Sequence, residues 1–273
     1  MAAVTTTRLP GVLPVGLKRA RVELTSYLRN RQAVMFTFAL PIVLLLLFGS
    51  IFKGNASGTN VPMRQVLISG IIASGIMSTT FSSLAIGIAV ARDDGTLHRL
   101  AATPMPKASY FIGKLGMAFA IAISETVVLL GLGVGLFGLH LPDTPGRWLT
   151  LVWVVLLGIF SCAMLGVAYS SVARNGRSAA AVVQLPYLSL QMISGVFFVF
   201  TQLPAFVQGI AAVFPLKWMA QGLRSVFLPS TFQAAEAAHA WEHGKIALVL
   251  GAWCVGAFLL CLATFKWRTR DSA

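Results

Sequence analysis

The sequence predicts an all-α membrane protein with six transmembrane helices, and three observations carry this prediction. Hydrophobic residues make up 57% of the 273 residues and charged residues only 11%, whereas soluble domains are about a quarter charged. Six apolar runs are about 20 residues long or longer, which is the length that an α-helix needs to cross a bilayer. No stretch between them resembles a separate soluble domain, so we expect one transmembrane domain over residues 1–273.

The six apolar runs are expected to cross the membrane as helices. The first run is too long for the apolar part of a signal peptide and has no convincing cleavage site, so we expect it to be retained as an anchor. The expected spans are residues 33–52, 66–90, 115–139, 148–172, 178–200 and 246–265.

The distribution of Lys and Arg sets the expected orientation. An even number of spans places both termini on one side, and that side carries fifteen of the 21 Lys and Arg residues. Because cytoplasmic loops are enriched in these residues, we expect a multi-pass protein of the plasma (inner) membrane with both termini in the cytoplasm. The cations flank apolar runs and form no stripe with interleaved aromatic residues, so we expect no nucleic-acid partner despite the net charge of +13.

The segment before the first span is basic, but apolar residues recur in it at near-helical spacing. This pattern predicts a helix over residues 15–31 that lies at the cytoplasmic headgroup boundary, with its apolar side toward the acyl chains. The alternative is a disordered basic tail that only determines topology. The apolar residues are Val15, Val22, Leu24, Tyr27 and Leu28.

The loop between the second and third spans, "RDDGTLHRLAATPMPKASY", has the features of a short helix over residues 94–103. Asp93 or Asp94 can cap the N-terminus of this helix, and Pro104 stops it. An apolar face with i, i+3, i+4 spacing is able to lie in the groove of a partner protein, and Arg99 could add an ionic contact. This face consists of Leu97, Leu100 and Ala101.

Three polar residues inside the expected spans are candidates for a transport path. Glu125 is the one acid near the middle of a span, so its side chain should face protein or water rather than lipid. It could contact a cationic substrate or carry a proton, or it could pair with a polar group on a neighbouring helix. Gln184 and Gln191 share one face of the fifth span, and either interhelical hydrogen bonds or a transport surface would explain them.

Between the fifth and sixth spans, residues 204–228 are expected to form a re-entrant helical hairpin that dips in from the outer face. Prolines divide the segment into two apolar pieces, each too short to cross a bilayer. Pro204 and Pro215 suit first-turn positions. Lys217 and Arg224 are expected to snorkel toward the outer surface.

The sequence offers little for enzyme chemistry. His239 and His243 are four residues apart with Glu242 between them, but no third zinc ligand is evident, so we expect no metal site and an exposed outer segment. The chain contains no phosphate-binding loop and no hydrolase motif. We therefore expect no enzyme activity and no directly bound cofactor, and any use of ATP requires another polypeptide.

Two stretches resemble the signatures of ABC-2-type ABC transporter permeases. "RDDGTLHRLAATPMPKASYFIGKL" is similar to the family loop, which reads roughly R-E-x-G-T-L-E-R-L-x-x-T-P followed by a G-K pair, with Asp replacing the usual Glu and His98 replacing an acid. "SGVFFVFTQLPAFVQGIAAVFPLKWMAQGLRSVFLP" is similar to the second signature, with Lys217 and Trp218 where the family often has Thr-Tyr. The residues that carry this outer signature are Pro204, Pro215, Leu216 and Arg224.

The resemblance implies a half-transporter. Two such subunits, identical or paralogous, would pair in the membrane among its lipids, and each would dock on a cytoplasmic ATP-binding cassette subunit that binds ATP and Mg. The short helix would be the coupling helix, and the interfacial helix a second contact with the ATPase. The coupling residues that the resemblance implies are Asp94, Gly95, Thr96, Leu97, Arg99 and Leu100.

The compact length resembles that of daunorubicin-resistance-type multidrug exporters, which implies ATP-driven export of a hydrophobic or amphiphilic drug, antibiotic or lipid. Three alternatives stay open. They are a polysaccharide or lipid-glycan exporter of the same family, a proton-coupled secondary transporter that uses Glu125, and a membrane-embedded enzyme that uses Glu125 with His239 and His243. The sequence leaves the substrate and the choice between homodimer and heterodimer open.

Overall fold

The computed structural model describes residues 11–56, 59–173 and 175–264. Within these residues the chain is helical and contains no β-strand beyond an isolated bridge between Asn55 and Pro62. Five helices are long and apolar enough to cross a membrane. The prediction of an all-α membrane protein is therefore confirmed, with five helices of spanning length among the described residues.

The five long helices begin and end within three residues of five predicted spans, with one exception. The third long helix begins at Lys107, eight residues earlier than predicted. One of the five is a continuous 31-residue helix in which α3 (Met63–Met77) passes through the π-helical turn η1 (Ser78–Ser82) into α4 (Ser83–Asp93). The other four are α2 (Arg31–Ile51), α6 (Lys107–Phe137), α7 (Pro145–Tyr169) and α11 (His243–Thr264).

The segment predicted as the fifth span is shorter than expected. Helix α8 (Gly176–Ile193) ends seven residues before the predicted boundary at Phe200 and is not among the five long apolar helices. It ends because Gly195 adopts a left-handed backbone, with φ of 71°, which turns the chain. The carbonyl oxygen of Val196 would lie only 2.3 Å from a Cβ at Gly70, so this turn packs directly on the backbone of α3.

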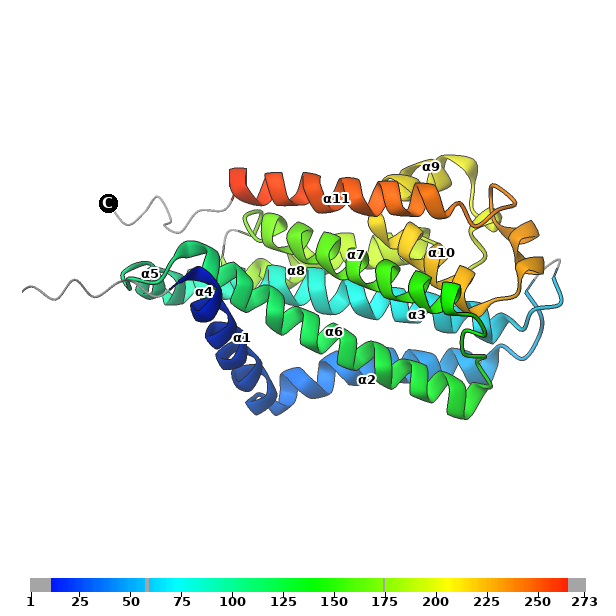
Figure 1. Cartoon of the computed structure of the whole chain (residues 1–273), viewed down its shortest axis with the longest axis horizontal. Helices are drawn as coiled ribbons and strands as arrows, with labels where there is room; N and C mark the ends of the chain where they lie inside the picture. Colours follow the sequence, from blue (N-terminus) through cyan, green and yellow to red (C-terminus); the bar gives the residue numbers. More distant parts are fainter. Residues whose placement is uncertain (1–10, 57–58, 174, 265–273) are drawn as a thin grey trace, which may run out of the picture.

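The long helices run side by side along the longest axis of the molecule (Figure 1). Helix α1 (Val12–Arg29) and the short helix α5 (Thr96–Ala101) lie at one end of the bundle, which we call the α5 end. Helices α9 (Ala205–Val213) and α10 (Pro215–Phe227) lie toward the opposite end. Helix α1 begins and α11 finishes at the α5 end (Figure 1).

The centre of the bundle is formed by α3 and α10. All residues of α10 are buried, and this helix packs against α3, α7 and α11. Glycine permits the close approach, because a Cβ at Gly222 would lie 2.9 Å from the side chain of Val154 on α7. The prolines flank the two short helices, with Pro204 as the N-cap of α9 and Pro215 as the first residue of α10.

Helix α9 is the exposed partner of α10. Its large side chains Phe206, Ile210 and Val213 are 72%, 51% and 59% exposed. An apolar face this exposed suits a lipid environment rather than water. The hairpin thus has one limb inside the bundle and one limb on its surface.

Candidate functional site

The turn that leads into α5 is built around Gly95. Its φ of 74° is left-handed, which glycine adopts at little cost, and it reverses the chain between α4 and α5. Asp94 Oδ1 accepts a hydrogen bond of 2.9 Å from the backbone N–H of Thr96. Hydrogen bonds from the Thr96 side chain and backbone lower the pKa of Asp94 below its usual value. Asp94 therefore supports the first turn of α5 as a carboxylate.

Asp93 has a different role from the one predicted. Its Oδ2 accepts a hydrogen bond of 3.0 Å from the backbone N–H of Gly176, the first residue of α8. Asp93 therefore interacts with the N-terminus of α8 rather than capping α5, where the N-cap residue is Gly95. Sequence spacing could not reveal this contact, because 83 residues separate the two groups.

Leu97 does not face a partner protein, contrary to the expectation from the sequence. It is 1% exposed and packs in a cluster with Leu84 and Ile88 of α4 and Tyr110 of α6. Leu100 is half-buried beside this cluster. A helix of six residues is not stable alone and needs an apolar anchor on its own chain.

The exposed surface of this region is polar and small. It consists of Asp93, Asp94, His98, Arg99, Ala101, Ala102, Thr103 and Pro104. Arg99 donates to Thr96 Oγ1 over 3.3 Å and enters no ion pair among the described residues. We call the exposed residues from His98 to Ala102 the α5 surface. They are the part of α5 that a second protein could contact.

The α5 region is tied to four helices of the bundle. Leu97 packs on α4 and α6, and Asp93 binds the start of α8. Arg92 donates to the end of α7, to the carbonyl oxygen of Ser170 over 3.0 Å and to its hydroxyl over 3.3 Å. Sequence analysis did not single out Arg92 or Ser170. A displacement of α5 would therefore reach α4 and α6 directly, and α7 and α8 through Arg92 and Asp93 at the end of α4.

Helix α1 lies against α6 and is anchored by a buried carboxylate. Glu23 accepts from Arg19 over 2.5 Å within α1 and from Lys114 of α6 over 2.8 Å. The two backbones come close because Gly113 lacks a side chain, and a Cβ there would lie 2.4 Å from Cγ of Arg19. The other side of α1 is apolar and exposed, with Leu13, Leu17, Val22 and Leu28 between 57% and 61% exposed.

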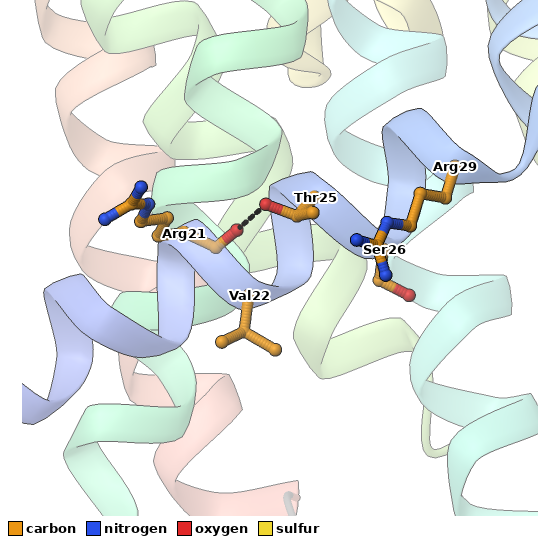
Figure 2. Close-up of a pocket in the computed structure, with 5 residues that line it drawn as sticks. All are labelled: Arg21, Val22, Thr25, Ser26 and Arg29. Carbon is orange, nitrogen blue, oxygen red and sulfur yellow. Dashed lines mark hydrogen bonds between the residues drawn. The ribbon is translucent and has the colours of Figure 1, made fainter.

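On its exposed side α1 has a shallow depression of about 430 Å³, shown in Figure 2. Arg21 and Arg29 lie at its two ends, and Val22 and Ser26 lie between them. Thr25 donates to the carbonyl oxygen of Arg21 over 2.8 Å, so its hydroxyl is already used within the helix. Two exposed guanidinium groups suit contacts with anionic lipid or with acidic side chains of a partner.

Glu125 lies inside the bundle beside the π-helical turn. It is 2% exposed and accepts a hydrogen bond from the hydroxyl of Thr79 on η1. Its Oε1 has no hydrogen-bond partner among the described residues and lies against Gly75. π-Helical turns inside α-helices are frequent at functional sites, because they re-aim side chains. Here the turn brings Thr79 to the one acid that lies away from the ends of the five long helices.

Thr79 also lines a cavity of about 570 Å³ that opens between α1, α2, α4 and α6. The walls combine aromatic and aliphatic side chains with a few polar groups, as in ordinary ligand pockets. Tyr27 and Asn30 lie on one side, Phe36 of α2 on another, and Lys114 of α6 on a third. This cavity and the Thr79–Glu125 pair form the candidate transport site. Sequence analysis missed Thr79, which looked like one small residue among many in its helix.

The two glutamines of α8 have different environments. Gln191 is 4% exposed and donates to Ser74 of α3 and, over 3.3 Å, to the hydroxyl of Tyr187. The hydroxyls of Ser74 and Tyr187 lie 3.0 Å apart, which completes a buried network between α3 and α8. Gln184 is half-buried and lies outside this network. The interhelical alternative therefore accounts for Gln191.

Lys217 and Arg224 do not snorkel to the surface as predicted. Arg224 is 2% exposed, pairs with Glu236 over 2.6 Å and donates to the carbonyl oxygen of Gly195 over 3.0 Å. Lys217 is 3% exposed and donates to Gln221 over 2.5 Å. Both cations find partners inside because all of α10 is buried in the bundle, whereas the prediction expected the two side chains to reach the outer surface. Leu216 of the same signature is fully buried.

The histidine pair lies at the start of α11 and in the segment before it. His239 and Glu242 have positive φ values of 51° and 48°, so the segment before α11 is not helical and the two imidazoles do not share a helix face. His239 contacts the carbonyl oxygen of Ala234, and His243 contacts Ser225. The part of the chain that the structure describes contains no group of three metal-ligating side chains.

Comparison with known proteins places most of the chain in one family. The family model for ABC-2 type transporters matches residues 20–228. The chain is 23% identical to YvfS of Bacillus subtilis, named as a transport permease, over 202 residues, which is 72% of this chain and 79% of that protein. It is also 23% identical to the inner membrane transport permease YadH of Escherichia coli over 70% of this chain and 75% of that protein.

A third relative is named for a more specific activity. YbhS of Escherichia coli, named as a multidrug ABC transporter permease, is 26% identical over 165 residues. This match covers 56% of the present chain but only 41% of YbhS.

Proposed function

The chain belongs to the ABC-2 type transporter family, and from this premise we propose that it is the permease subunit of an ABC exporter that moves a hydrophobic or amphiphilic compound outward. The observation that supports the proposal best is the α5 region. It exposes a small polar surface at one end of the bundle and is tied to four helices of the bundle. A partner that moved this surface would move the bundle.

The partner is a cytoplasmic ATP-binding cassette subunit that binds ATP and Mg. The chain has no phosphate-binding loop, so the nucleotide chemistry must lie in another polypeptide. The α5 surface, with Arg99 at its centre, is the first contact. The arginines of the α1 depression are the second. In this proposal the α5 end of the bundle, where α1 begins and α11 finishes, faces the cytoplasm.

The substrate path begins at the cavity beside Thr79 and Glu125. The cavity is bordered by α1 and by the first turns of α2, so an amphiphile in the cytoplasmic leaflet could reach it from the side. Glu125 does not line the cavity itself, but its carboxylate accepts from Thr79 in the cavity wall and would place negative charge behind that wall for a cationic group. A hydrophobic, cationic drug or lipid fits this chemistry, and the name of YbhS as a multidrug transporter permease agrees with a drug substrate. A second permease subunit, identical or paralogous, completes the path.

The proposal is tested by transport into inside-out vesicles that contain the tagged chain and its co-purified subunits. We expect uptake of a hydrophobic cation to require ATP and to persist when a protonophore removes the proton gradient. Arg99→Glu should reduce both the yield of the co-purified ATPase and the uptake. Lys53→Glu, an equal charge change at an exposed site on the opposite end, serves as the matched control and should reduce neither.

Two results would contradict the proposal. Uptake that continues without ATP but stops with the protonophore would favour a proton-coupled transporter that uses Glu125. Purification that yields no ATP-binding subunit from the native membrane would remove the basis for the coupling contact.

A further inference from the structure

A second cavity lies at the end of the bundle opposite α5 and is not part of the proposed coupling or transport sites. Its volume is about 560 Å³, within the range of small-molecule pockets. Four segments meet around it: the start of α3, the loop between α6 and α7, the start of α7, and the residues after α10. Because these are the points where long helices begin and end, the cavity lies at the depth of lipid headgroups in any membrane that the bundle crosses.

The lining of this cavity is rich in charged side chains that form no ion pair among the described residues. Arg64, His140, Asp143 and Arg147 all contribute to the wall. None of them takes part in the ion pairs found among the described residues. Arg64 Nε is buried and has no hydrogen-bond acceptor within the described chain. A buried guanidinium N–H without an acceptor is costly, so this geometry calls for an anion from outside.

The cavity is held in shape by contacts between its segments. Gly138 ends α6 with a left-handed φ of 64°, and its carbonyl oxygen accepts from Gln65 of α3 over 3.5 Å. The backbone N–H of Leu139 donates a hydrogen bond of 3.0 Å to the carbonyl oxygen of Gly133. Trp148, next to Arg147, is 44% exposed, as aromatic residues at the headgroup level commonly are. The site is therefore a preformed cavity rather than a chance arrangement of surface arginines.

We propose that this cavity binds the headgroup of a phospholipid, with Arg64 and Arg147 on the phosphate. Arginine suits this role because its planar N–H fork matches phosphate oxygens. Asp143 makes the site less suited to a purely anionic headgroup and offers an acceptor for an ammonium group. The headgroup that fits the whole lining is therefore zwitterionic phosphoethanolamine. This binding would be possible whichever end of the bundle faces the cytoplasm, because both leaflets of a membrane contain phospholipid headgroups.

Lipid titration of the purified, detergent-solubilised full chain tests the proposal, with bound lipid counted by native mass spectrometry. The probes are phosphatidylethanolamine, phosphatidylglycerol and inorganic phosphate. Arg64→Gln and Arg147→Gln should each weaken phosphatidylethanolamine binding about tenfold, the effect of losing one charge-assisted hydrogen bond. Lys53→Gln removes an exposed cation at the same end but outside the cavity, so it should leave binding unchanged.

Asp143→Asn should shift the preference from phosphatidylethanolamine toward phosphatidylglycerol, and an unchanged preference would overturn the assignment of the ammonium group. Equal lipid binding by both arginine variants and Lys53→Gln would overturn the site. Inorganic phosphate that displaces the lipid at comparable concentration would overturn the lipid assignment in favour of free phosphate. If Arg64→Gln does not fold, Arg147→Gln and Arg64→Lys carry the same test, and equal unfolding temperatures without lipid verify their folding.

Discussion

The anchoring of α5 by Leu97 leads to a prediction about local stability. Leu97→Ala removes most of an apolar side chain that is 1% exposed and packs on α4 and α6. Three carbon atoms leave the cluster, and at about 0.8 kcal/mol per buried methylene the change costs roughly 2–3 kcal/mol. Since six residues do not form a stable helix alone, the loss should appear as detachment of α5 rather than unfolding of the bundle.

The assay is hydrogen exchange of the backbone amides of α5, followed by mass spectrometry of peptides from the intact protein. A loss of 2–3 kcal/mol should raise the exchange rate about 30- to 150-fold, because each 1.4 kcal/mol is a factor of ten. His98→Ala, a change to an exposed residue of the same helix, is the matched control and should alter exchange little. Exchange in Leu97→Ala that is no faster than in His98→Ala would refute the anchoring role.

Three further predictions concern buried or capping charges. Glu125→Gln keeps an acceptor for Thr79 but removes the negative charge, so uptake of a cationic substrate should fall while the unfolding temperature stays within about 2 °C of the wild type; an equal loss for a neutral substrate would contradict a charge contact. Arg224→Met leaves Glu236 buried without its partner and should destabilise the fold by about 3–5 kcal/mol, whereas the double change with Glu236→Leu should recover most of that loss in denaturant unfolding; no recovery would argue against the pair. Because the pKa of Asp94 is lowered in the folded protein, its stabilisation is present above the unfolded value of 3.8 and is lost as pH falls through the lower folded value. The difference in α5 stability between wild type and Asp94→Ala should therefore stay constant from neutral pH down to about pH 5 and vanish in stronger acid, as thermal scans with a fluorescent label on α5 would detect.

Much of the fold could be predicted because each long helix leaves a local pattern. Apolar runs predicted the positions of the long helices, and prolines predicted where α9 and α10 begin. The exception at the end of α8 arose from a single residue. Gly195 turns the chain within an apolar stretch whose sequence predicts that the helix continues to Phe200. Hydrophobicity alone contains no information on backbone dihedral angles.

The candidate site could be predicted only in part. Glu125 was identified from the sequence because an acid inside an apolar run is costly and therefore informative. Its partner Thr79 was not identified, because 46 residues separate the two and threonine is common in such helices. The same limit applied to Arg224. Its partner Glu236 follows the 3₁₀-helical segment Ser230–Ala235, beyond the end of α10. From the sequence alone the arginine therefore looked like a surface cation.

The sequence by itself determined the membrane class, the positions of the long helices, the short helix after the second span, and the family signatures. These properties depend on composition and on residues close together in the chain, where hydrophobicity and turn chemistry act locally. Only the tertiary structure decided that Leu97 faces inward, that α10 is buried, and that Asp93 binds α8. Each of these depends on which distant helices meet, and that choice is made by packing over the whole bundle.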